Sequence, residues 1–211
     1  MVSQQRKHVR APGRASDERR AGANAIPEAH ILDVTYGLLL DVGLGGTSMA
    51  GIARRAGVSR ATLYRRWPNV HAVVAALMTR EFAAMTERAF DPEAPSARSG
   101  LVLGVVRMVR AVREHPLVRK IVAVDPEFLL PYLLQRRGTS TEHQLQAIEA
   151  AIRAGRRDHS IRRGNAAVQA RTVWLTALPF ALTAPVLVDD DVSLAALERQ
   201  CQHLLDRYLA P

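Results

Sequence analysis

The fold of this chain is decided by residues 47–70, TSMAGIARRAGVSRATLYRRWPNV, which predict two short helices around a tight turn. The first helix is expected to end at Gly57, because glycine tolerates the left-handed conformation that closes many helices. Ser59 is expected to cap the second helix by accepting a hydrogen bond from its first turn, and Pro68 to stop it. Two helices joined by three or four residues that include glycine form a helix-turn-helix.

The second of these helices is expected to be amphipathic. Leu63 and Trp67 lie one turn apart and are predicted to pack inward. A short helix that exposes basic, hydroxyl and aromatic groups is suited to the major groove of DNA. The outward positions hold Arg60, Thr62, Tyr64, Arg65 and Arg66.

The pattern T-S-M-x-x-I-A-x-x-A-G-V-S-x-x-T-L-Y-R-x-W-P-N closely resembles the DNA-binding domain of the TetR family of bacterial transcription regulators. The resemblance spans residues 27–80 and implies a homodimer that binds a near-palindromic DNA operator and responds to a small-molecule effector. Val70 departs from the family pattern, which often has a lysine that contacts the DNA backbone at this position. The DNA-contacting residues that we expect are Thr47, Ser48, Ser59, Arg60, Ala61, Thr62, Tyr64, Arg65 and Arg66.

Composition agrees with a nucleic-acid partner. The chain has 211 residues and a formal net charge of +9, a balance that favours polyanions. Its single cysteine, Cys201, excludes an intramolecular disulfide and suits a reducing cytoplasm, so we expect a cytoplasmic, nucleoid-associated protein. Residues 172–188 are uncharged and apolar, but Pro179 and Pro185 interrupt them, which favours a buried helix over a membrane span.

Three regions are expected along the chain. Residues 1–24 are basic and poor in apolar side chains, which fits either a solvated, disordered tail or an arm that lies on DNA phosphates. Residues 25–85 are expected to form the DNA-binding domain, with the helix-turn-helix at about 48–67. Residues 86–211 are expected to form an effector-binding and dimerisation domain, reached through a long helix over residues 70–90.

The second domain is predicted to be helical, which makes the fold class all-α. Apolar residues recur at helical spacing, and no alternating strand pattern persists. The segments concerned are residues 101–113, 117–124, 126–135, 139–154 (ended by Gly155), 166–182 and 192–209.

No constellation of catalytic or metal-binding residues stands out. Cys201 and His203 are two positions apart, which on a helix separates the side chains by about 200° and argues against a shared ion. We therefore expect no enzyme, no metal and no cofactor. Aromatic and methionine side chains in the second domain fit either ordinary core packing or, as the resemblance implies, an effector cavity. The candidate cavity residues are Met108, Phe128, Tyr132, Trp174 and Phe180.

The last two predicted helices carry more apolar surface than a terminal pair needs. They either close the monomer core or pair with their symmetry mates in a four-helix dimer interface, and we expect the dimer. The residues concerned are Val173, Leu175, Leu178, Leu182, Leu194, Leu197, Leu204 and Leu205. The function predicted is that of an effector-released repressor. The alternatives are a nonspecific DNA-binding protein and a ligand- or partner-binding protein that uses its basic face.

Overall fold

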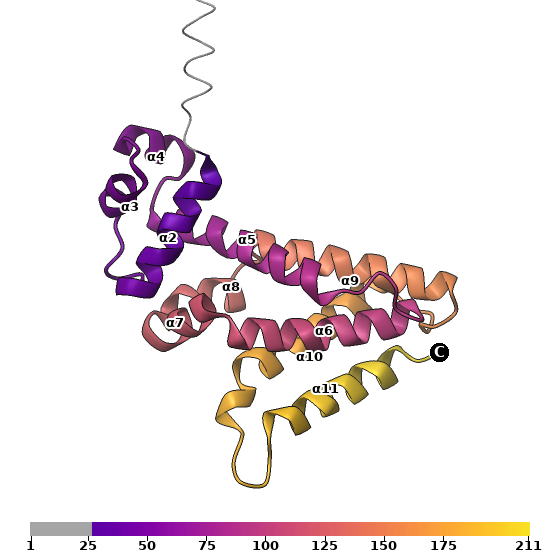
Figure 1. Cartoon of the computed structure of the whole chain (residues 1–211). Helices are drawn as coiled ribbons and strands as arrows, with labels where there is room; N and C mark the ends of the chain where they lie inside the picture. Colours follow the sequence, from indigo (N-terminus) through magenta and orange to yellow (C-terminus); the bar gives the residue numbers. More distant parts are fainter. Residues whose placement is uncertain (1–26) are drawn as a thin grey trace, which may run out of the picture.

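The computed structural model describes residues 27–211, which form helices and connecting turns without a strand (Figure 1). The predicted all-α class is therefore confirmed. The proposed arm, residues 1–24, lies outside the described residues.

The amino-terminal domain packs three helices around the predicted turn. These are α2 (Glu28–Val42), α3 (Met49–Ala56) and α4 (Arg60–Arg66). Its core is apolar because each helix contributes large side chains that exclude water, with Ile31, Ile52 and Leu63 fully buried. α2 contacts both α3 and the long helix that follows α4, so it joins the helix-turn-helix to the rest of the chain.

Helix α5 (Val70–Ala89) connects this domain to the rest of the molecule (Figure 1). Asn69 caps it by accepting a hydrogen bond from the backbone N–H of Ala72 at 2.9 Å. The first half of α5 packs on α2, and its second half lies along α6 and α9. A single hydrophobic cluster runs from Ile31 through Leu77 to Ile121, so the core does not stop at the expected domain boundary.

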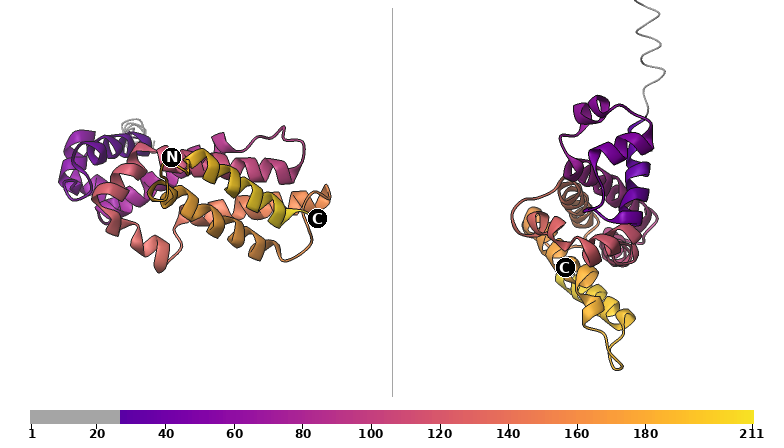
Figure 2. Two further views of the ribbon diagram at one scale, coloured as in Figure 1. Left: turned by 90° about the horizontal axis from the view of Figure 1, so that it is seen from below. Right: turned by 90° about the vertical axis from the view of Figure 1, so that its left-hand side faces the viewer.

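The remaining helices form an elongated body, seen from two further sides in Figure 2. α6, α9, α10 and α11 enclose a second hydrophobic cluster that includes Leu101, Ile152 and Leu205. The elements are α6 (Ala97–Glu114), α7 (Pro116–Val124), η1 (Pro126–Phe128), α8 (Leu130–Leu134), α9 (Thr139–Arg157), α10 (Ala166–Leu182), η2 (Ala184–Val186) and α11 (Leu194–Leu209).

Several predicted boundaries were wrong. The helix expected over residues 101–113 begins earlier, at Ala97, because Ser96 caps it by accepting a hydrogen bond from the N–H of Ser99. The segment expected over residues 126–135 divides into η1 and α8.

Gly155 does not end its helix, because α9 continues to Arg157. The glycine is needed for packing: a Cβ atom there would lie 2.4 Å from Cδ1 of Ile161. The last helix begins at Leu194 instead of residue 192, because Ser193 caps it by accepting a hydrogen bond from the N–H of Ala196. Within residues 27–211, no helix is both long and apolar enough to cross a membrane.

Candidate nucleic-acid interface and ligand cavity

The turn between α3 and α4 has the predicted geometry. Ser48 caps α3 by accepting a hydrogen bond from the N–H of Gly51 at 3.1 Å. Gly57 has a φ of 67°, the left-handed conformation that ends α3 at little cost for a residue without a side chain. Ser59 caps α4 by accepting a hydrogen bond from the N–H of Thr62 at 3.0 Å. These local bonds fix the direction in which α4 leaves the turn.

Helix α4 has one buried and one exposed face. Leu63 is fully buried and Trp67 is 7% exposed, so both anchor the helix on the domain core. On the other side, the side chains of Arg60, Ala61 and Arg65 are exposed. Tyr64 is 53% exposed, which is unusual for an aromatic ring in a packed domain. This face is available to a partner.

Three of the expected DNA-contacting residues are less available than the sequence suggested. Thr47 is buried, and its hydroxyl donates a hydrogen bond to the carbonyl of Gly43 at 2.7 Å inside the fold. Thr62 is half-buried, and its hydroxyl lies 2.8 Å from that of Ser59. Arg66 is also half-buried. Ser48 and Ser59 are exposed, but their hydroxyls already serve as helix caps.

A polar contact that the sequence did not indicate joins the two domains. The buried carboxylate of Asp125, at the end of α7, accepts hydrogen bonds from the N–H groups of Leu44 at 2.8 Å and Gly45 at 3.2 Å. These two residues form the turn that leads into α3. The sequence shows an aspartate before a proline at residues 125–126. No neighbouring residue indicates that this carboxylate would bind the distant turn at Leu44.

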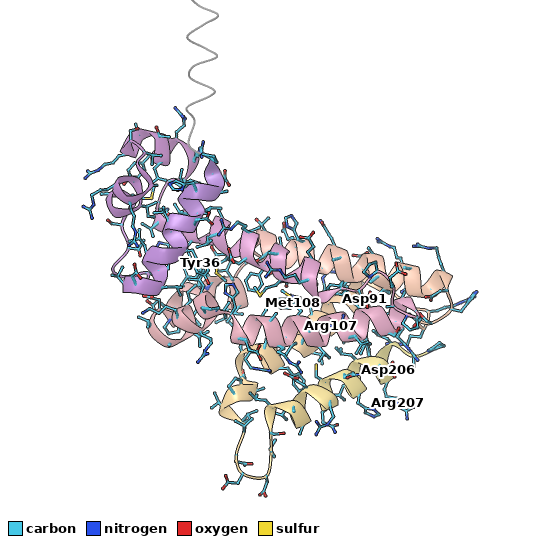
Figure 3. The ribbon with its side chains drawn as sticks, in the orientation of Figure 1. Tyr36, Asp91, Arg107, Met108, Asp206 and Arg207 are labelled. Atoms are coloured by element: carbon cyan, nitrogen blue, oxygen red, sulfur yellow. The ribbon has the colours of Figure 1, made fainter. Side chains whose placement is uncertain are left out.

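A second polar cluster lies where α2, α5 and the α6–α7 junction meet. Arg80 forms ion pairs of 2.7 Å with both Asp33 and Glu81. Glu81 also lies 3.3 Å from Nε2 of His115, whose ring meets that of Tyr36 edge-on. Tyr36 is labelled at this junction in Figure 3, and its burial raises the pKa of its hydroxyl.

A cavity of about 750 Å³ opens among α5 to α10. Four of the five predicted residues line it: Met108, Phe128, Tyr132 and Trp174. Met108 lies between α5 and α6 in Figure 3, with its sulfur 4.0 Å from the hydroxyl of Thr86 on α5. The fifth candidate, Phe180, packs against both hydrophobic clusters and is not among the residues that line the cavity.

The cavity also reaches the recognition helix, which the sequence did not indicate. Its wall includes Trp67, which anchors α4, and Asn69, which caps α5. Next to them, the ring of His71 stacks on that of Phe128 with centroids 5.9 Å apart. A molecule in the cavity would therefore touch the segment that holds α4 in place.

The last two helices are only partly free for a partner. Val173 and Leu205, expected at an interface, are fully buried inside the monomer. Leu175 and Leu204 are 61% and 51% exposed, so each helix keeps an apolar position on its surface. The other four expected residues, Leu178, Leu182, Leu194 and Leu197, are half-buried.

These features define a class of protein: a helix-turn-helix DNA-binding regulator with a ligand-sized cavity next to its recognition helix, α4. Within residues 27–211, no group of three or more His, Cys, Asp or Glu side chains could hold a metal ion.

Comparison with known proteins identifies the family. The family model described as "Bacterial regulatory proteins, tetR family" matches residues 31–77. An HTH-type transcriptional regulator of Mycobacterium bovis is 32% identical over 179 residues, which cover 85% of this chain and 92% of that relative. The HTH-type transcriptional repressor KstR of Rhodococcus jostii is 32% identical over 111 residues, or 52% of each chain.

Solved structures agree on the fold. The TetR-family repressor QsdR of R. erythropolis superposes with a TM-score of 0.65 at 16% identity, covering 86% of this chain and 93% of that one.

The family model and the M. bovis relative show that the chain belongs to the TetR family, and it is a DNA-binding transcriptional regulator. The relatives that it matches are regulators, not enzymes.

Proposed function

We propose that this protein is a homodimeric repressor that binds a near-palindromic operator and is released by a small molecule. One observation carries the proposal: α4 exposes Arg60 and Tyr64 on one side, while its anchor Trp67 lines the cavity on the other. The same short helix is thus available to DNA and to a ligand. Repression is also the sign of regulation named for KstR and QsdR.

DNA reading is assigned to the exposed side chains of α4. Arg60 is at the amino-terminal end of the helix, where recognition helices approach base edges in the major groove. Arg65 is in the last turn, where its guanidinium suits a phosphate. Ala61 and Tyr64 complete the exposed face, and apolar or aromatic groups there suit the thymine methyl group.

Two copies of α4 are needed because one helix reads only a few base pairs. Useful specificity requires half-sites roughly 34–36 Å apart on one face of the DNA. The exposed Leu175 and Leu204 on α10 and α11 support a two-fold interface that pairs these helices with their symmetry mates.

Release is assigned to a shift between two arrangements of α5. A ligand changes such an equilibrium only when it binds one state more tightly than the other. Trp67, Asn69 and His71 line the cavity at the amino-terminal end of α5. A ligand that contacts them would bind the two arrangements of α5 with different affinity, because these side chains would move with the helix. In this proposal residues 25–85 bind DNA in the cytoplasm at the nucleoid, and residues 86–211 bind the effector and the partner copy.

Selection of bound fragments from a genomic library with the purified full-length chain tests this proposal. We expect enrichment of a few fragments that share an inverted repeat, each bound by two protein copies in analytical ultracentrifugation. Even recovery of all fragments, with a steep salt dependence, would favour the nonspecific DNA-binding alternative. Recovery of no fragment would favour the partner-binding alternative and reject the proposal.

A further inference from the structure

The charged side chains that line the cavity are both arginines. Among the described residues of its wall these are Arg136 and Arg137, and no Asp or Glu contributes. A cavity of about 750 Å³ is also within the size range of small-molecule sites in proteins. The charge of the wall therefore limits which molecules it can hold.

The part of the cavity between α5 and α6 is lined by buried apolar side chains, among them Met78, Val105 and Val109. Three polar side chains of the wall are already paired. The hydroxyls of Thr79 and Thr86 donate hydrogen bonds to carbonyls of their own helix, at 2.9 and 2.8 Å. The indole N–H of Trp174 donates to Gln144 at 2.8 Å. An apolar body can therefore enter without leaving these donors unsatisfied.

The two arginines of the cavity wall are neighbours in the sequence and lie at the surface. Arg136 and Arg137 are both exposed, just before the start of α9. The guanidinium of Arg136 lies over the ring of Tyr132, 5.0 Å from its centroid, which holds it at the wall. The N-cap of α9 is Gly138, which offers no side chain to the N–H groups of the first turn. Glu142 lies in the first turn of α9 and offsets the positive end of this helix, so the two arginines are the groups that favour an anion at this point.

We infer that the cavity takes an amphiphile with a long apolar body and one anionic head group, a carboxylate or a phosphate monoester. The apolar body lies between α5 and α6, and the head group lies against Arg136 and Arg137. This inference rests on the proposed role of the cavity as the effector site and specifies the chemical class of the effector.

Intrinsic fluorescence of the full-length protein gives a direct readout, because both tryptophans of the chain, Trp67 and Trp174, line the cavity. The probes are dodecanoate, monododecyl phosphate, 1-dodecanol and dodecyltrimethylammonium, each below its micelle concentration. We expect at least one anionic probe to bind about tenfold more tightly than the alcohol, as expected for a charge-assisted hydrogen bond, and the cation to bind most weakly. The two anions separate a carboxylate preference from a phosphate preference, and either result supports the inference.

A charge-matched pair of variants tests the placement of the head group. R136Q/R137Q should lose the preference for the anion while it keeps the affinity for 1-dodecanol. R157Q/R163Q removes two exposed arginines outside the cavity wall and should change neither affinity. Equal or tighter binding of the alcohol or the cation, binding of none of the four probes, or an unchanged preference in R136Q/R137Q would overturn the inference. Operator binding by the same preparation, measured without a probe, tests the proposed function separately.

Discussion

The carboxylate of Asp125 holds the turn at Leu44 and Gly45 in place. It accepts a hydrogen bond from the N–H of Leu44 at 2.8 Å and one from the N–H of Gly45 at 3.2 Å. Gly43 makes this approach possible, because its φ of 73° suits glycine and a Cβ there would lie 3.1 Å from the Asp125 carboxylate. Asp125 follows α7 and precedes Phe128, which lines the cavity. The cavity wall and the entry to α3 are therefore joined by a short, buried path.

Replacement of Asp125 should destabilise the protein, because it leaves backbone N–H groups without an acceptor. D125A is expected to lower the free energy of unfolding in urea by about 2 kcal/mol, the usual cost of an unsatisfied buried donor such as the N–H of Leu44. D125N should lose less, since its amide oxygen can still accept. E127A, an exposed change two residues away, is the control. A loss in D125A no larger than that in E127A would contradict the structural role given to this contact.

Arg60 and Arg65 should affect DNA binding in different ways. R60A is expected to weaken operator binding by about 1–3 kcal/mol and to relax preference at one base pair, because a base contact carries sequence information. R65A should weaken all duplexes alike and reduce the slope of log affinity against log salt by about one.

Gel-shift titrations of operator and random duplexes at several salt concentrations measure both effects. Equal losses on the two duplexes for R60A would remove the assignment of Arg60 to a base. An unchanged salt slope for R65A would remove the assignment of Arg65 to a phosphate.

The helix-turn-helix could be predicted from sequence because its determinants are local. Ser59 caps an N–H only three residues away, and the left-handed conformation of Gly57 depends on its own missing side chain. Residue spacing alone also placed Leu63 and Trp67 on the buried face.

Features that depend on long-range packing could not be predicted. Asp125 meets Leu44 across 81 positions, and Gly155 is explained only by Ile161 packing against it. Trp174 and Phe180 were both candidates for the cavity, yet only Trp174 lines it. Which side of a helix faces a cavity depends on neighbours that periodicity does not identify.

The ion pairs of Glu198 should make stability depend on pH. This buried carboxylate on α11 bonds to Arg110 and Arg113 on α6, and the hydrogen bond from Arg110 holds the pKa of Glu198 below its ordinary value of 4.5. A carboxyl with a lowered folded-state pKa stabilises the fold above its unfolded pKa, and this stabilisation is lost as the pH falls through the folded value.

E198Q should therefore flatten the fall in unfolding free energy as the pH drops below 4.5, the ordinary glutamate value. Urea denaturation at a series of acidic pH values measures this effect. E142Q, at an exposed position of α9, is the matched control and should keep the wild-type pH dependence. An identical acid profile for E198Q and wild type would show that the pair does not contribute in this way.

The proposed dimer interface can be tested at Leu175 and Leu204, the two expected interface residues that the monomer leaves most exposed. L175D/L204D should leave the monomer folded, because neither side chain is buried, but it should place charge in an apolar interface where it cannot be paired. We expect sedimentation velocity to show a monomer at micromolar concentration and operator affinity to fall sharply, since two half-sites can no longer be bound together. L134D changes a leucine on α8 that is 76% exposed, away from α10 and α11, and should remain dimeric. If L175D/L204D sediments as a dimer, the interface lies on another surface.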